Sequence, residues 1–195
     1  MKKDVASKPY HHGDLRNALV EAARAILEEE GLSGLSLRAV ARRAGVSHAA
    51  PYRHFSNHET LLAELVGEGF AELRKDLAAA GAAPGLEADR ITSMGGAYMR
   101  FVVRRPALAR LMFGSQLANR NSFPELSEAA DAIAIEIGDA LNDSALGLAV
   151  WAAVHGLAML ALENVIDLGQ RRAGLSVLPS RAEILLRSLL TVSRH

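Results

Sequence analysis

Apolar residues recur every three or four positions along nearly the whole chain, a spacing that places them on one face of an α-helix. Each apolar run stops near a glycine, proline or asparagine, and the pattern nowhere alternates as it does in a β-strand. The predicted helices are, in order, residues 14–30, 36–44, 47–55, 56–77, 86–104, 106–113, 124–141, 144–168 and 179–193. The sequence therefore predicts an all-α fold.

The two short helices within residues 36–55 are expected to form a helix-turn-helix. Ser36 has the side-chain oxygen that caps a starting helix, and Gly45 can adopt the left-handed conformation that ends one. Ser47 can cap the second helix, so the chain turns sharply between the two. Pro51 follows Ser47 by four residues, where its missing N–H is tolerated because the helix is only starting.

The charge of this segment favours binding to nucleic acid. No Asp or Glu occurs between Glu30 and Glu59, whereas the interval holds several cationic or titratable side chains: Arg38, Arg42, Arg43, Arg53, His48, His54 and His58. A protruding helix with nearby cations and no anions suits the phosphate backbone of a duplex. The alternative is a solvated basic helix pair within some other α-helical domain.

Residues from about Tyr10 to Leu65 resemble the DNA-binding domain of the TetR/AcrR family of transcriptional regulators. The resemblance rests on the helix after Asp14 and on four further motifs: Leu35-Ser36-Leu37-Arg38, Ala41 with Ala44-Gly45-Val46-Ser47, Tyr52-Arg53-His54-Phe55, and Leu61-Leu62. Residues 10–16 resemble one subset of the family. Trp151, His155 and Gly156 resemble a C-terminal effector domain named after its Trp, His and Gly (WHG).

This resemblance implies a homodimeric regulator, usually a repressor, that binds a palindromic DNA operator and is released by a small-molecule effector. The chain is expected to have three parts. Residues 1–9, which hold Lys2, Lys3 and Lys8, are predicted to be a mobile basic arm, and a frayed terminus without function is the alternative. Residues 10–60 are expected to be the helix-turn-helix DNA-binding domain, and residues 61–195 a helical effector-binding and dimerisation domain.

The predicted DNA-binding residues lie in the helix-turn-helix and at the start of the helix that follows it. In a helix-turn-helix the beginning of the second helix meets the base edges, so His48, Ala49 and Pro51 are expected to face the bases. Tyr52 and His54 are better placed for phosphates. The complete set is Ser36, Arg38, Ser47, His48, Ala49, Pro51, Tyr52, Arg53, His54 and His58.

The helix after the helix-turn-helix is expected to begin with a capping box formed by Ser56 and Glu59. The family usually has a lysine where this chain has His58, and an imidazole is a weaker phosphate partner. We therefore expect DNA affinity to rise as the pH falls.

The C-terminal helices carry candidates for an effector cavity and for a dimer interface. The predicted effector-binding residues are Met94, Tyr98, Met99, Phe101, Met112, Phe113, Trp151, His155 and Met159. Few charges lie on these apolar faces, which favours a lipophilic or aromatic effector; ordinary core packing is the alternative role for each residue. The predicted dimer contacts are Leu148, Trp151, Ile184, Leu185 and Leu189, and the alternative is that these helices bury each other within a monomer.

The composition excludes several kinds of site and indicates where the protein is located. The chain has 195 residues, half of them hydrophobic, a formal net charge of zero and no cysteine. The lack of cysteine excludes disulfides, thiolate zinc sites and cysteine nucleophiles. The start of the chain has no secretory pattern, and the uncharged residues 144–162, although near the length of a bilayer span, are interpreted as a helix buried by protein. A cytoplasmic protein is expected.

Enzyme motifs are also missing from the sequence. We find no Glu-x-x-His pair, no His-Glu-x-x-His site, no glycine-rich phosphate loop and no Ser, His and Asp set in a recognisable context. We therefore expect no catalytic residues, no metal and no cofactor. Two alternatives stay open: a dimeric DNA-binding protein without an effector, and an α-helical enzyme.

Overall fold

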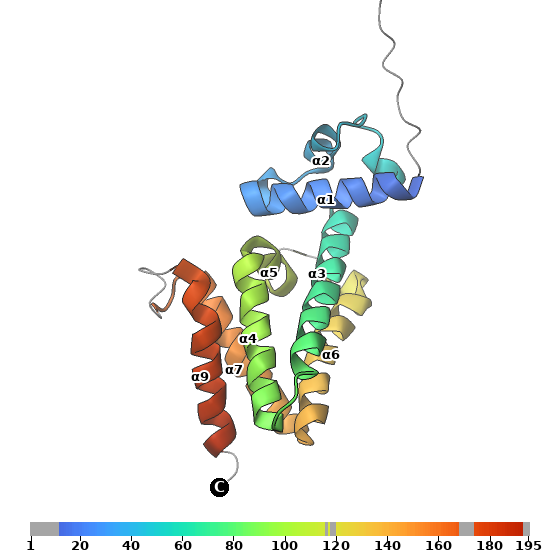
Figure 1. Ribbon diagram of the computed structural model, residues 1–195. Helices are drawn as coiled ribbons and strands as arrows, with labels where there is room; N and C mark the ends of the chain where they lie inside the picture. The colour runs from blue at the N-terminus through green and yellow to red at the C-terminus, as the bar shows by residue number, and fades with distance from the viewer. Residues whose placement is uncertain (1–11, 116, 118–119, 168–173, 193–195) are drawn as a thin grey trace, which may run out of the picture. The chain divides into compact units, whose positions relative to one another are not determined.

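The computed structural model describes residues 12–115, 117, 120–167 and 174–192 (Figure 1). The described residues form helices and connecting turns without a strand, so the all-α prediction is confirmed. The chain divides into two compact units, residues 1–65 and 66–195, and the division falls inside one helix, α3 (His58–Gly81). The basic arm predicted over residues 1–9 lies outside the described residues.

The N-terminal unit is built from α1 (His12–Glu30), a 3-10 turn η1 (Leu32–Gly34), α2 (Leu37–Arg43), a second 3-10 turn η2 (Pro51–Arg53) and the first turns of α3. α1 follows the predicted amphipathic pattern, and its buried side chains include Leu19, Ala23, Ile26 and Leu27. These pack with buried residues of α2 and α3 into one small core, whose other members include Val40, Ala41, Phe55, Leu61, Leu62 and Leu65. The core fixes α2 on α1 and, between α2 and α3, buries Pro51 and Phe55 while residues 47–49 and 52–53 stay exposed.

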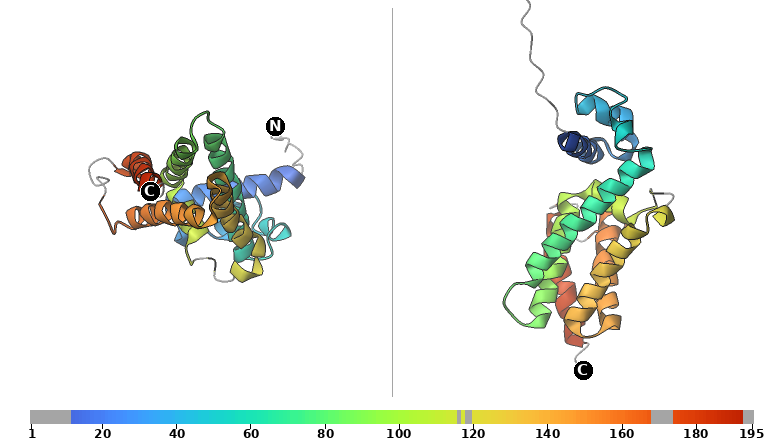
Figure 2. Two further views of the ribbon diagram at one scale, coloured as in Figure 1. Left: turned by 90° about the horizontal axis from the view of Figure 1, so that it is seen from below. Right: turned by 90° about the vertical axis from the view of Figure 1, so that its right-hand side faces the viewer.

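The C-terminal unit contains the rest of α3 with α4 (Glu87–Arg104), α5 (Pro106–Phe113), η3 (Arg120–Ser122), α6 (Pro124–Leu141), α7 (Ser144–Leu162), η4 (Gly174–Val177) and α9 (Leu178–Val192). α4 packs along α9, and α6 packs along α7 (Figure 2). Prolines begin α5 and α6 at the first helical position, as the sequence predicts.

α6 and α7 approach each other closely at two glycines. A Cβ added to Gly147 would lie 2.4 Å from the Cα and 2.5 Å from the backbone nitrogen of Gly138. Such distances are far below a normal carbon contact, so only glycine allows the two backbones to meet here. The sharp connection before this contact uses Asn142 in the left-handed conformation, and Asp143 caps α7 by accepting a hydrogen bond from the Leu146 N–H at 2.9 Å.

α7 ends at Leu162, six residues before the predicted end of this helix at residue 168. Asn164 takes a left-handed conformation with φ 56°, and the N–H groups of Asn164 and Val165 donate to the carbonyls of Ala161 and Leu160. This is a Schellman motif, which closes a helix by satisfying its last carbonyl groups. The prediction of a helix to residue 168 is wrong, although asparagine is one of the residue types that end the predicted helices.

α7 buries one side and exposes the other. Its buried residues, Gly147, Val150, Val154, Ala158, Ala161 and Leu162, form a single stripe, whereas Leu148 keeps 58% and Leu160 keeps 43% of its surface exposed. The helix is long and apolar enough to cross a membrane by length and composition alone. The interpretation of residues 144–162 as a helix buried by protein therefore holds for only one side of α7 within the described part of the chain.

Candidate functional site

The turn after α2 forms as the sequence predicts. Ser36 caps α2 by accepting a hydrogen bond from the Ala39 N–H at 3.1 Å. Gly45 has φ 70°, a left-handed conformation that a side chain would strain, and the next N–H, of Val46, donates to the Ala41 carbonyl at 3.0 Å. The chain therefore turns sharply out of α2 and presents residues 47–54 beyond it.

The second helix of the predicted helix-turn-helix is not a regular α-helix. Only Pro51–Arg53 is helical, as the 3-10 turn η2, whereas the recognition helix was predicted over residues 47–55. Pro51 has no N–H to donate to the Ser47 carbonyl, which instead accepts a shorter-range bond from Ala50 at 2.9 Å. The proline thus tightens the segment into consecutive turns, and the expectation that a helix tolerates it here is wrong.

Most of the residues predicted to bind DNA lie on the surface of this segment. Ser36, Arg38, Ser47, His48, Ala49 and Arg53 are exposed, and Tyr52 keeps 53% of its surface exposed. His54 and His58 are half-buried. Pro51 is buried, so it packs into the unit and is not available to face bases as predicted.

Several of these residues line one hollow of about 470 Å³ on the N-terminal unit. The hollow is open to solvent and combines the first residues of α2 with the first residues of α3; it is lined by Leu35, Ser36, Leu37, Arg38, Tyr52, Ser56, Asn57 and His58. Helix N-termini carry a partial positive charge and free N–H groups, which suit an anion. The Nε2 of His58 is buried here without a hydrogen-bond partner among the described residues.

The cap of α3 differs from the predicted capping box by one residue. Asn57 accepts a hydrogen bond from the Thr60 N–H at 2.9 Å, and Thr60 Oγ1 accepts one from the Asn57 N–H at 3.3 Å. A reciprocal pair of Asn57 with Thr60 therefore caps α3, one residue later than the predicted cap at Ser56. Asparagine caps as well as serine does, so the sequence allowed both registers.

Two ion pairs join helices of the N-terminal unit. Arg16 of α1 forms a bidentate pair with Glu64 of α3 at 2.6 Å, and its guanidinium lies 5.7 Å from the centre of the Phe55 ring. Arg43 forms a bidentate pair with Glu29 at 2.6 Å, which lowers the pKa of the Glu29 carboxyl. Arg43 is thus neutralised within the unit, whereas the exposed Arg38 and Arg53 flank the hollow and the turn.

The C-terminal unit contains a separate cluster of aromatic side chains. Phe70 of α3, Tyr98 of α4, Phe113 of α5, and Trp151 and His155 of α7 pack with ring centres 4.6 to 6.3 Å apart. Tyr98 Oη lies 2.9 Å from His155 Nδ1. Burial raises the pKa of Tyr98 and lowers the pKa of His155, so both stay neutral and the phenol can donate to the imidazole.

A cavity of about 10 Å³ adjoins this cluster, which is room for about one water molecule. It is lined by Leu77, Ile91, Met94, Gly95, Tyr98, Ile137, Val150, Trp151 and Val154. Of the nine predicted effector-binding residues, Met94, Tyr98 and Trp151 line the cavity. Phe113 and His155 belong to the adjoining cluster, Met99, Phe101 and Met112 are fully buried, and Met159 is half-buried.

The residues predicted for a dimer interface lie on α7 and α9. Leu148 and Ile184 expose 58% and 59% of their surface, and Trp151, Leu185 and Leu189 are half-buried. Apolar side chains of this size on the surface are typical of an interaction face.

Comparison with known proteins places both units in one family. Residues 19–65 match the profile described as "Bacterial regulatory proteins, tetR family", and residues 91–175 match "Tetracyclin repressor-like, C-terminal domain". The chain belongs to the TetR family. Its N-terminal and C-terminal units correspond to the two domains that these profiles describe.

Relatives of the TetR family match part of the chain. The HTH-type transcriptional regulator Rv1816 of Mycobacterium tuberculosis is 30% identical over 109 residues, which are 55% of this chain and 47% of that protein. The HTH-type transcriptional repressor KstR of Mycolicibacterium smegmatis is 31% identical over 97 residues, 50% of this chain and 48% of that one. The matched region thus spans about half the length of these curated relatives.

Solved structures match nearly the whole TetR-family chain. A protein of unknown function from Rhodococcus sp. RHA1 is 31% identical with a TM-score of 0.70, and the match covers 93% of this chain and 98% of that one. The fatty acid degradation regulator FadR from Bacillus halodurans has the same TM-score at 13% identity, covering 93% and 96% of the two chains. At that identity the second likeness shows the fold alone.

Proposed function

We propose that this TetR-family chain is a DNA-binding transcriptional regulator, a repressor, that acts as a homodimer on a palindromic operator in the cytoplasm. The observation that carries the proposal is the turn at residues 47–53, which exposes polar and basic side chains beside the hollow at the starts of α2 and α3. The turn and the hollow together carry cationic side chains and helix N-termini. No carboxylate is among the residues that line the hollow.

The turn and the hollow contact different parts of the duplex. Ser47, His48 and Ala49 meet the base edges, where His48 donates or accepts a hydrogen bond and Ala49 contacts thymine methyl groups. The hollow receives a phosphate: Ser36, Arg38, Tyr52 and His58 line it, and Arg53 and His54 follow Tyr52 in the chain. A phosphate oxygen would give the buried Nε2 of His58 the partner that the described chain does not supply.

Dimerisation uses the exposed apolar side of α7 together with α9. Leu148 and Ile184 are the most exposed large apolar side chains described on these two helices, flanked by Trp151, Leu185 and Leu189. Two chains joined there present two turns to two half-sites of a palindrome. Dimerisation also removes from water the apolar face that α6 leaves uncovered on α7.

The C-terminal unit is proposed to take a small lipophilic or aromatic effector as a domain of the WHG type. The cavity beside Tyr98 and Trp151 is lined by apolar side chains and no charged group, which disfavours an ionised ligand. An effector must enlarge this space, since it holds about one water molecule, and flexible Met94 is the lining residue best able to move. Release from DNA follows if the enlarged state misplaces the DNA-reading turns.

The small size of the cavity favours a second candidate, a dimeric DNA-binding protein without an effector. A thermal-shift screen of the purified protein against uncharged lipophilic compounds separates the two. Saturable stabilisation that weakens DNA binding supports the effector, and stabilisation by none of the compounds supports the second candidate.

The DNA-binding proposal is tested with a duplex selected by the protein from a randomised pool. Arg53→Ala is expected to weaken binding and to lower the slope of log affinity against log salt, because Arg53 is exposed on the turn and no described carboxylate pairs with it. Arg43→Ala is the matched control: this arginine belongs to the same unit but is paired with Glu29. Equal losses in the two variants, or no duplex enriched from the pool, would contradict the proposal.

A further inference from the structure

A hollow of about 240 Å³ opens on the surface of the C-terminal unit between α3 and α4, and we call it the α3–α4 groove. It is lined by three residues of α3 and three of α4: Asp76, Ala79, Ala80, Ala97, Arg100 and Arg104. The groove is separate from the apolar cavity beside Trp151, because the two share no lining residue. It combines an apolar wall of three alanine methyl groups with two guanidinium groups.

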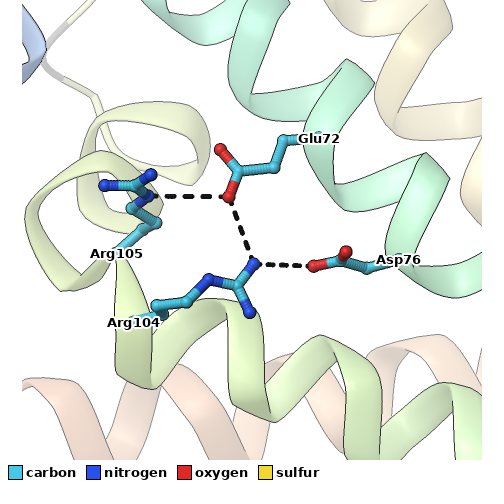
Figure 3. Close-up of polar contacts among 4 residues, drawn as sticks. All are labelled: Glu72, Asp76, Arg104 and Arg105. Carbon is cyan, nitrogen blue, oxygen red and sulfur yellow. Dashed lines mark hydrogen bonds and ion pairs between the residues drawn. The ribbon is translucent and has the colours of Figure 1, made fainter.

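Carboxylates of α3 hold the side chain of Arg104 in place at one edge of the groove. Arg104 Nη2 donates to Asp76 Oδ2 at 2.7 Å and to Glu72 Oε1 at 3.1 Å, and Arg105 Nε lies 3.5 Å from the same Glu72 oxygen (Figure 3). The other terminal nitrogen of Arg104, Nη1, points away from Glu72 and has no partner within the described chain. A guanidinium whose orientation is already fixed can donate its remaining N–H groups to a ligand at a small entropic cost.

Arg100 lies one turn before Arg104 on α4, and its side chain is exposed. It forms neither an ion pair nor a hydrogen bond with any residue that the structure describes. Glu183 of α9 lies across Gly96 from it: from a Cβ added to Gly96, Glu183 Oε1 would be 2.9 Å and Arg100 Nη1 3.1 Å away, yet the two side chains are not ion-paired. Of the arginines that close α4, Arg100 is therefore the one whose charge has no described carboxylate partner.

The charges in the lining of the α3–α4 groove favour a ligand with a single negative charge. Two guanidinium groups and one carboxylate leave one net positive charge. A guanidinium binds a carboxylate through two parallel N–H···O bonds, and such charge-assisted bonds are stronger than neutral ones. Asp76 repels a second negative charge, which disfavours a dicarboxylate or a phosphate dianion.

We propose that the α3–α4 groove is a binding site for a small organic monocarboxylate. Its carboxylate is held by Arg100 and Arg104, and its short apolar body packs on the three alanine methyl groups. The ligand is small, since the groove of about 240 Å³ is below the roughly 300 to 1,000 Å³ that is typical of sites for drug-sized molecules. The site contains no residue of the DNA-reading turn or of the apolar cavity, so the inference does not depend on the proposed function.

The site is tested with four probes: butyrate, acetate, uncharged butyramide and inorganic phosphate. Each is titrated at low salt into the ¹⁵N-labelled full chain, and the chemical shifts of the arginine side-chain N–H groups give the dissociation constant. We expect saturable binding of butyrate. Acetate should bind about three- to tenfold more weakly because it lacks two methylene groups, and butyramide at least about tenfold more weakly because it has no charge. Phosphate should also bind more weakly than butyrate.

Four variants test the residues. Arg100→Gln should weaken butyrate binding about tenfold or more, and Ala79→Leu, which fills the groove, should weaken butyrate binding more than acetate binding. Both positions are exposed, so both variants are expected to fold. Glu183→Gln should strengthen binding about two- to threefold, since it removes a carboxylate near Arg100. Arg74→Gln is the matched control because Arg74 is an exposed arginine of α3 that pairs with Glu136 outside the groove, and its affinity should stay within about twofold.

Saturable butyrate binding that is lost in Arg100→Gln and reduced in Ala79→Leu supports the site. The inference is overturned if butyrate causes no saturable shift, or if butyramide binds as tightly as butyrate. An equal loss in Arg74→Gln also overturns it, because the effect would then follow the net charge of the chain. Tighter binding of phosphate than of butyrate, or weaker butyrate binding by Glu183→Gln, would show that the ligand class is wrong.

Discussion

The contact between α6 and α7 allows a sharp test with two alanine substitutions on the same helix. Gly147 and Gly156 both lie within α7, so both variants gain the same intrinsic preference of alanine over glycine for a helix. Their surroundings differ: a Cβ at Gly147 would lie 2.4 Å from the Gly138 Cα, whereas one at Gly156 would meet nothing within 4 Å. The pair therefore isolates the cost of separating the two helices.

The size of the effect follows from these distances. The helical preference contributes about 0.5 to 1 kcal/mol of stabilisation at each position. At Gly147 the neighbouring atoms are backbone, which cannot rotate away, so α6 and α7 must move apart by about 1 Å to restore normal contact. Overpacking of this kind costs roughly 1 to 3 kcal/mol, at the upper end here because the whole interface shifts. We expect Gly147→Ala to be about 2 to 3 kcal/mol less stable than Gly156→Ala.

Thermal unfolding followed by Trp151 fluorescence measures this difference, because the tryptophan lies on α7 between the two sites. For a chain of this size, 2 to 3 kcal/mol corresponds to a separation of roughly 4 to 12 °C between the two midpoints. Midpoints that agree within error, or a Gly147→Ala protein more stable than the unmodified chain, would show that the close approach of α6 and α7 is wrong.

Two further predictions concern single histidines. Burial lowers the pKa of His155, so below its ordinary value of 6.5 the unfolded chain binds a proton that the folded chain resists, and stability falls as the pH drops. Urea unfolding at several pH values should show a shallower loss on acidification for His155→Gln, and an unchanged slope would contradict the burial of this imidazole. His58→Lys adds a permanent cation to the phosphate hollow, so DNA affinity should rise and the slope of log affinity against log salt should steepen by about 0.9. Between 50 and 200 mM salt, this steeper slope corresponds to roughly an additional 3.5-fold loss of affinity. An unchanged slope would show that residue 58 does not contact a phosphate.

Local signals in the sequence were sufficient where one residue determines the backbone. Ser36 and Gly45 define the start and end of α2, and the prolines at the starts of α5 and α6 define those helices to the residue. The spacing of three to four residues between apolar positions also marks the buried side of α3 from Leu61 to Leu77. In each case the hydrogen bond or burial that decides the structure lies within a few residues of the signal.

Elsewhere the predicted helix boundaries were wrong because the local sequence allowed two backbone conformations. Pro51 could be tolerated at the start of a helix or could tighten the chain into 3-10 turns, and the structure takes the second course. Asn57 and Ser56 are both good caps for α3, and Asn164 ends α7 although no glycine is present. Sequence periodicity does not decide between options of nearly equal free energy.

The candidate site depends further on contacts between distant residues, which carry no periodic signal. The pair of Arg43 with Glu29 removes one cation from the predicted DNA-binding charge, and the sequence predicted neither this pair nor the pair of Arg104 with Asp76 of α3. The predicted effector residues were chosen by residue type, which does not distinguish the three that line a cavity from fully buried core residues such as Met99 and Phe101.

The central claim is that two copies of the turn at residues 47–53 read a palindrome. Selection of duplexes from a randomised pool, followed by measurement of the mass of the complex by sedimentation, tests it most directly. The account predicts that an inverted repeat is enriched and that each repeat is bound by an even number of chains, two at the least. A Leu148→Glu, Ile184→Glu protein, in which charge is placed on the proposed dimer face, should remain folded and lose binding to the repeat. Enrichment of a sequence without two-fold symmetry, or saturation by a single chain, would contradict the account.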